Sequence, residues 1–246
     1  MKQLMKYHIK DTYLGALFFI VIYTIINFAA FTTISVLVMK VDGTEVKGNV
    51  GGFEMAYLIC IFVIFVASYG ENLRFFTQYS FTRKQVIKST FLTVALISLT
   101  FSLATFITTA INNALIHDEK FQFMTYLSEL YGAQSSLANN GLVTIIFWFA
   151  LFSVFAMFGL FLAILFVRAN KYGRVLIAAG TPVLIFLVFP ILIGSIKPLQ
   201  TLLSNALYIL GGFRTHNPLI GALSLLVCSG ILGALSYLVN RRTEVK

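Results

Sequence analysis

Six long apolar runs divide this chain, and no charged residue falls inside any of them. The runs cover residues 14–39, 55–69, 89–113, 142–167, 175–196 and 218–240. A helix needs about 20 apolar residues to cross a hydrocarbon core about 30 Å thick, and every run except 55–69 reaches that length. We expect the helix of the short run to continue into its flanking residues. A charge inside a run would cost about 2.5 to 3.5 kcal/mol, so the pattern indicates an all-α membrane protein with six transmembrane helices.

Lysine and arginine are unevenly divided between alternate connections. Of the 18 basic residues, thirteen fall on the side that holds both termini and five on the other side. The thirteen are Lys2, Lys6, Lys10, Arg74, Arg83, Lys84, Lys88, Arg168, Lys171, Arg174, Arg241, Arg242 and Lys246, and the five are Lys40, Lys47, Lys120, Lys197 and Arg214. Because cytoplasmic loops carry the excess of Lys and Arg, we expect both termini in the cytoplasm. Topology and contact with anionic lipids explain the net charge of +9, and no nucleic-acid partner is expected.

The composition leaves little length for a soluble module. Hydrophobic residues make up 59% of the chain, and the longest connections, 114–141 and 197–217, are short. We therefore expect one transmembrane domain over residues 1–246, in the cell membrane as a multi-pass protein. Short amphipathic helices are expected at the membrane surfaces, over residues 1–13, 71–88, 118–131 and 198–210.

The connection 71–88 carries the most information. Leu73, Phe76 and Tyr79 recur at helical spacing on one face, and polar residues occupy the others. The pattern predicts a short amphipathic helix that emerges from the second span and ends at Ser80-Phe81-Thr82. Two interpretations are open. The helix lies on the lipid headgroups, or its aromatic face inserts into a groove on a soluble partner.

This connection resembles a motif of ABC-2 type exporter permeases from Gram-positive bacteria. Glu71-Asn72-Leu73-Arg74-Phe75 followed by Thr82-Arg83-Lys84 is similar to the segment that carries the coupling helix in that family, with Ser80 where the family has Gly. The whole chain resembles the family in plan, with a basic amphipathic N-terminus, six spans and a short outer helix before the last span. Within the family, the chain looks most like permeases of peptide exporters, such as those for phenol-soluble modulins.

The resemblance implies a permease subunit that exports hydrophobic or amphipathic peptides. Its partners would be cytoplasmic ABC ATPase subunits, a second identical or homologous permease, and membrane lipids. The residues that would dock the ATPase are Leu73, Arg74, Phe75, Phe76, Tyr79, Phe81, Thr82, Arg83 and Lys84. The chain has no Gly-x-x-x-x-Gly-Lys-Ser/Thr phosphate loop, so ATP and Mg²⁺ are expected in the ATPase. We expect this chain to bind no cofactor of its own and to be no enzyme.

Polar side chains within the spans have two interpretations. Asn27, Thr105, Thr109 and Asn112 are candidates for lining a transport pathway. Amides and hydroxyls in spans also serve commonly as interhelical hydrogen bonds, each contributing about 0.6 kcal/mol. Pro182 and Pro190, eight residues apart in the fifth run, predict a bent helix, either as a hinge or as a static bend.

The remaining reactive side chains suggest no chemistry. His8, His117 and His216 fall in three different connections without metal-ligand spacing, so no metal site is expected. Cys60 and Cys228 lie within predicted spans and are expected to be buried free thiols. An ion-coupled carrier is disfavoured because no acidic residue falls in a run, and Glu54, just before the second run, is expected in an outer connection. The alternative to an exporter is a non-transporting immunity or scaffold protein that binds a peptide or a partner.

Overall fold

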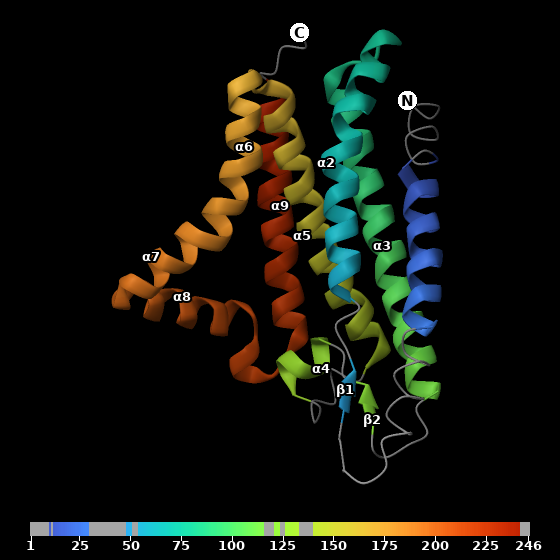
Figure 1. Ribbon diagram of the computed structural model, residues 1–246, viewed down its shortest axis with the longest axis vertical. Helices are drawn as coiled ribbons and strands as arrows, with labels where there is room; N and C mark the ends of the chain where they lie inside the picture. Colours follow the sequence, from blue (N-terminus) through green and yellow to red (C-terminus); the bar gives the residue numbers. More distant parts are fainter. Residues whose placement is uncertain are drawn as a thin grey trace.

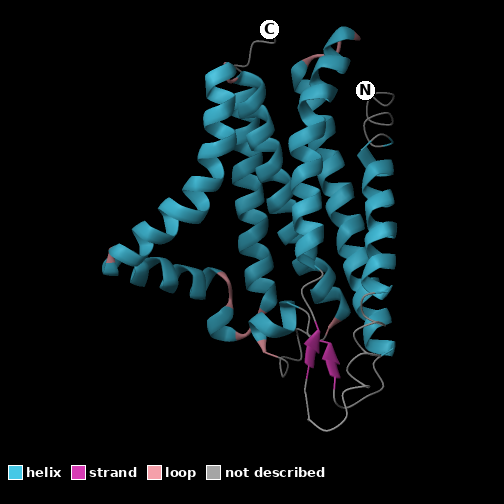
Figure 2. Ribbon diagram, in the orientation of Figure 1, coloured by secondary structure: helices cyan, strands magenta, loops and turns pink. Residues whose placement is uncertain are grey.

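The computed structural model describes residues 10, 12–29, 48–50, 54–115, 121–123, 126–132 and 140–241 (Figure 1). An N-terminal helix, Thr12–Ala29, comes first. The helices that follow are α2 (Glu54–Gln78), α3 (Arg83–Leu115), α4 (Tyr126–Tyr131), α5 (Gly141–Arg168), α6 (Lys171–Val183), α7 (Phe189–Ser195), α8 (Lys197–Leu210) and α9 (Pro218–Arg241). A π-helical segment, η1 (Leu184–Val188), joins α6 to α7, and a 3-10 turn, η2 (Phe213–Thr215), precedes α9. Two three-residue strands, β1 (Gly48–Val50) and β2 (Phe121–Phe123), pair in parallel at one end of the bundle (Figure 2).

Five helices are long and apolar enough to cross a membrane, which indicates a helical membrane protein. They are the N-terminal helix, α2, α3, α5 and α9. The short second run does continue into its flank as expected, since α2 extends from Glu54 through Gln78. Cys60 and Cys228 are free thiols, as predicted, but they are not buried within the chain, since Cys60 is half-buried and Cys228 is exposed.

Helix α5 is the centre of the bundle and contacts α2, α3 and α9. Its Trp148 and Phe152 pack with Tyr57 of α2 and Phe101 of α3, and Ile20 of the N-terminal helix joins the same cluster. A Cβ atom at Gly159 of α5 would lie 2.6 Å from the carbonyl oxygen of Phe62, so α2 and α5 approach closely because this position is glycine. Small residues of this kind let helix backbones meet where a larger side chain would hold them apart.

The fifth apolar run does not form a straight span. It is divided into α6, η1 and α7, with the π-helical segment between Pro182 and Pro190. The predicted bend is therefore confirmed, and its cause is the pair of prolines, each of which removes a backbone donor. We call residues 171–210, from α6 through α8, the arm. Figure 1 shows it leaving the bundle and returning through α8, which bears out the expected short helix before the last span.

The structure corrects the expected position of Glu54, and some other expectations concern residues that it does not describe. Glu54, expected in an outer connection, is the first residue of α2 and is fully buried. A buried carboxylate thus does lie within a candidate span, and one argument against an ion-coupled carrier is lost. Residues 1–9 of the expected N-terminal amphipathic helix, together with His8 and His117, lie outside the described residues.

Candidate functional site

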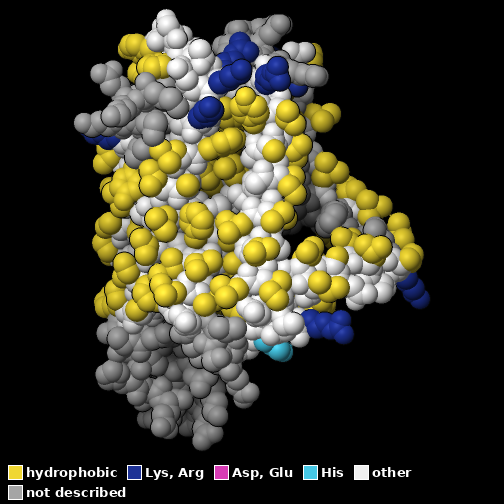
Figure 3. Space-filling view, turned by 180° about the vertical axis from the view of Figure 1, so that it is seen from behind, with side chains coloured by type: hydrophobic (Ala, Val, Ile, Leu, Met, Phe, Trp, Pro, Cys, Tyr) yellow, Lys and Arg dark blue, Asp and Glu magenta, His cyan; other side chains and the backbone are white. Residues whose placement is uncertain are grey.

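One end of the bundle holds most of the described basic residues, and we call it the basic end. It contains the turn between α2 and α3, the turn between α5 and α6, the start of the N-terminal helix and the end of α9 (Figure 1). Its described Lys and Arg residues are Lys10, Arg74, Arg83, Lys84, Lys88, Arg168, Lys171, Arg174 and Arg241. Figure 3 shows such residues gathered at this end, above a broad apolar band. The described basic residues away from it are Lys197 and Arg214.

The turn between α2 and α3 has a well-defined helix cap. Ser80 adopts a left-handed backbone conformation with φ of 60°, the conformation that glycine takes most easily. The amide of Phe81 donates to the carbonyl of Phe76 and that of Ser80 to the carbonyl of Thr77, each at 3.2 Å. These two bonds, with the edge-to-face contact between the Phe76 and Phe81 rings, form a Schellman cap. Ser80 thus holds a backbone conformation that glycine adopts without steric cost.

Helix α3 begins with its own cap immediately afterwards. The Thr82 amide donates to Oε1 of Gln85 at 3.0 Å, and the Gln85 amide donates to the Thr82 carbonyl at 2.9 Å. A Thr with Gln three residues later is the pattern of a capping box. The chain therefore reverses direction in a few residues, with both flanking helices hydrogen-bonded up to the turn.

The predicted docking residues divide by burial. Leu73 and Phe76 are 1% and 2% exposed and pack against Val86, Ile87 and Leu160. The predicted apolar face is therefore mainly an internal packing face, because α2 continues straight through it rather than giving rise to a separate surface helix. The exposed members are Arg74, Tyr79, Thr82 and Lys84, and the half-buried ones are Phe75, Phe81 and Arg83.

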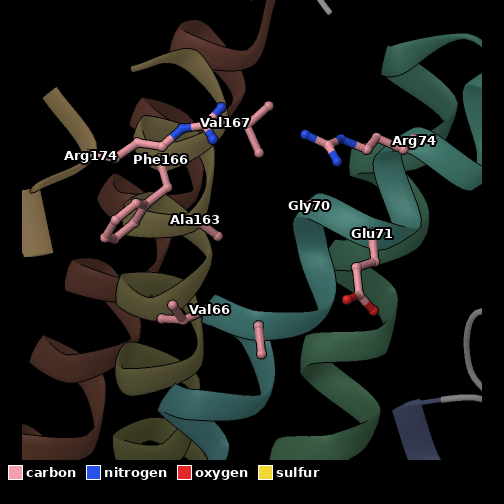
Figure 4. Close-up of a pocket in the computed structure, with 9 residues that line it drawn as sticks. Val66, Gly70, Glu71, Arg74, Ala163, Phe166, Val167 and Arg174 are labelled. Carbon is pink, nitrogen blue, oxygen red and sulfur yellow. The ribbon is translucent and has the colours of Figure 1, made fainter. Parts of the chain in front are cut away.

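A cavity of about 350 Å³ opens beside this turn, between α2, α5 and α6 (Figure 4). Arg74 and Glu71 of α2 and Arg174 of α6 supply its charged groups. Val66, Ala67, Gly70, Ala163, Phe166 and Val167 form the rest of its wall. Arg74 and Arg174 are a hundred positions apart in the sequence, and only the packing of α2 and α6 around α5 places them at the same cavity.

The candidate pathway residues on α3 are engaged with their own helix. Thr105 is fully buried, and its hydroxyl donates to the Phe101 carbonyl at 2.9 Å. Thr109 is half-buried and donates to the Thr105 carbonyl, also at 2.9 Å. Asn112 is buried on the same face of α3, whereas Asn27 is half-buried on the N-terminal helix. The hydroxyl of Ser102, another polar residue of the same span, donates across to the Ile145 carbonyl of α5 at 2.6 Å. These contacts favour the packing interpretation of the hydroxyls.

At the opposite end, Tyr131 connects three elements. Its hydroxyl donates to the Gly211 carbonyl at 2.6 Å, and its own carbonyl lies 3.1 Å from Nδ1 of His216. The helix over 118–131 was expected to lie flat on the outer leaflet, but Leu127 and Tyr131 of α4 are buried against α5 and α9. Burial raises the pKa of Tyr131 to about 12.

Within the described ranges, no three His, Cys, Asp or Glu side chains lie close enough to hold a metal ion. Comparison with protein-family models, with curated proteins and with solved structures found no match to this chain.

Proposed function

We propose that this chain is the permease subunit of an ATP-driven ABC exporter in the cell membrane, moving hydrophobic or amphipathic peptides out of the cell. The observation that carries the proposal is the doubly capped turn between α2 and α3 at the basic end. It presents Tyr79, Thr82 and Lys84, all exposed, beyond the last packed layer of the bundle. A soluble partner can contact these side chains without any rearrangement of the chain.

The proposal places the basic end in the cytoplasm, with both termini there and with the bent segment α6–η1–α7 as a sixth span. The excess of Lys and Arg at that end supports this orientation. Six passages return the chain to its starting side, which agrees with the start of the N-terminal helix and the end of α9 lying at the same end (Figure 1).

The mechanism follows from how the turn connects to the bundle. Closure of an ATPase dimer, which binds ATP and Mg²⁺, would push on Tyr79 and the residues after it. Because Leu73 and Phe76 pack against Leu160 of α5, a push on the turn is transmitted to α5 through direct contacts. The result is a tilt of α2, α3 and α5 that changes access to a pathway. A second permease, identical or homologous, completes that pathway against the exposed apolar arm.

The test is co-purification through a tag on this chain with its candidate ATPase, followed by vanadate-sensitive ATP hydrolysis in reconstituted membranes. We expect Tyr79→Ala combined with Lys84→Glu to abolish the stimulation of hydrolysis while leaving the melting temperature unchanged, because both side chains are exposed. Lys171→Glu, also exposed at the basic end but outside the turn, is the matched control and should retain stimulation. Equal stimulation in the double variant would refute the docking turn. A chain that purifies alone in mild detergent would favour the immunity or scaffold alternative.

A further inference from the structure

The cavity at the basic end combines a charged rim with an apolar wall. Arg74 and Arg174 stand at the rim, and Val66, Ala163 and Phe166 line the part that reaches into the bundle. Figure 4 shows the two arginine side chains extending toward each other from α2 and α6 across the space. Two guanidinium groups that face one another repel, and an anion between them removes that repulsion.

No carboxylate that lines the cavity neutralises the two guanidinium groups in the described structure. Glu71 is the acidic residue among those that line it, and its carboxylate points away from both guanidinium groups (Figure 4). Arg174 uses its Nε to donate to the Ala169 carbonyl at 3.2 Å, which directs the side chain while its terminal nitrogens stay available as donors. The rim therefore carries two forks of N–H donors that face the same cavity.

The chemistry of the ligand follows from the two parts of the cavity. Arginine forks match the oxygens of a phosphate and bind them with paired hydrogen bonds. Below the rim, Val66 and Phe166 belong to candidate membrane spans, so the part of the ligand that contacts them is apolar. A soluble protein cannot reach that depth, whereas a lipid of the adjoining leaflet presents a phosphate at the surface and hydrocarbon beneath it. Basic pockets between transmembrane helices on the cytoplasmic side commonly hold anionic headgroups in this way.

We infer that this cavity is a binding site for an anionic phospholipid, with the phosphodiester between Arg74 and Arg174 and an acyl chain along the apolar wall. The lipid would join α6 to α2, two elements that otherwise meet mainly through α5. The inference goes beyond the proposed transport function and holds whether or not the chain is a permease.

The experiment is native mass spectrometry of the full chain, purified in detergent and titrated with phosphatidylglycerol. We expect Arg74→Gln with Arg174→Gln to weaken retention of the lipid by about tenfold or more, since each arginine near a membrane surface contributes substantially to anionic-lipid binding. The matched control is Lys84→Gln with Lys171→Gln, which removes the same charge at the same end outside the cavity and should bind as the wild type does. Unchanged retention in the arginine variant, or an equal loss in the control, would overturn the site.

A second variant keeps both charges and fills the space. A Cβ atom at Gly70 would make only an ordinary 3.5 Å contact with Val167, so Gly70→Leu is tolerated by the backbone and projects into the cavity. It should lose phosphatidylglycerol while its melting temperature in lipid-free detergent stays that of the wild type. If the arginine variant fails to fold, Gly70→Leu provides the test by itself. Wild-type retention of phosphatidylglycerol in Gly70→Leu would refute the proposed site.

Two further arms identify the source of the phosphate. Phosphatidylcholine, which has a phosphodiester but no net charge, should be retained more weakly than phosphatidylglycerol. Inorganic phosphate at millimolar concentration should fail to displace bound phosphatidylglycerol. Equal retention of the two lipids would show that net charge is not recognised, and displacement by inorganic phosphate would show a free-phosphate site. The first result would overturn the preference for an anionic lipid, and the second would overturn the lipid itself as the ligand.

Discussion

Helix α5 and the arm are both apolar, yet the protein uses them in opposite ways. Thirteen residues of α5 are buried within the chain, whereas none of α6 is. Helix α5 is continuous over 28 residues, and small residues such as Ala156, Gly159 and Ala163 let three other helices pack closely around it. The arm is bent by its prolines and leaves the bundle, so its apolar side chains face outward. Apolar sequence thus indicates a membrane environment without indicating which surfaces meet within one chain.

Removal of a large side chain should give the greatest contrast between the two regions. Phe152 of α5 is fully buried between Trp148 and Phe101. We expect Phe152→Ala to lower the free energy of unfolding by about 4 kcal/mol, because it leaves a cavity in packed protein. Leu176→Ala in α6, where the side chain is 74% exposed, should cost far less. Thermal melting in detergent measures both, and similar losses would mean that the arm is packed as tightly as the bundle.

Addition of a side chain tests the same comparison from the other direction. Gly159→Leu in α5 would place a Cβ atom 2.6 Å from the Phe62 carbonyl oxygen and should cost about 3 kcal/mol through overpacking. Gly180→Leu in α6 meets no atom within 4 Å and should leave the melting temperature nearly unchanged. An equal tolerance of both changes would contradict the close approach of α2 and α5.

The junction between the two regions depends on Tyr131. Tyr131→Phe leaves the Gly211 carbonyl at the end of α8 without its donor, and we expect a loss of about 1 to 2 kcal/mol. Because the pKa of Tyr131 is raised to about 12 in the folded protein, its contribution is complete below pH 10 and is lost as the pH rises from 10 toward 12. Between pH 10 and pH 12, the melting temperature should fall more steeply with pH in the wild type than in Tyr131→Phe. The same pH dependence in both proteins would show that the Tyr131 hydroxyl does not stabilise this junction.

The smallest effect concerns the turn at the basic end. Ser80→Gly should stabilise the bundle by about 0.5 to 1 kcal/mol, because glycine adopts the left-handed conformation without steric cost. Ser80→Val should destabilise it by a comparable or larger amount. A rise in melting temperature with valine would mean that the turn does not hold this conformation in the membrane.

Much of the fold could be predicted because the relevant signals are local. The bounds of α5 and α9 agree with the apolar runs 142–167 and 218–240 almost residue for residue, since the cost of placing a charge in hydrocarbon acts on each position separately. The bend near Pro182 follows equally directly from a missing backbone donor. The break at Ser80-Phe81-Thr82 is also a local signal, because residues within the turn end one helix and begin the next.

The partners of each face could not be predicted in this way. Leu73, Phe76 and Tyr79 are equally compatible with one amphipathic face, but only packing against Leu160 decided that the first two are buried and the third is exposed. Glu54 was placed outside because it borders a run, whereas its burial depends on the helices around it.

The amino-acid sequence alone therefore accounts for the helical membrane class, the bounds of α5 and α9 and the basic end, because hydrophobic length, charge and proline act within a few residues. The tertiary structure was needed for the central position of α5, the separation of the arm, and the placement of Arg74 and Arg174 around one cavity. Those features depend on contacts between residues far apart in the chain, and an apolar surface packs as readily against lipid as against another helix.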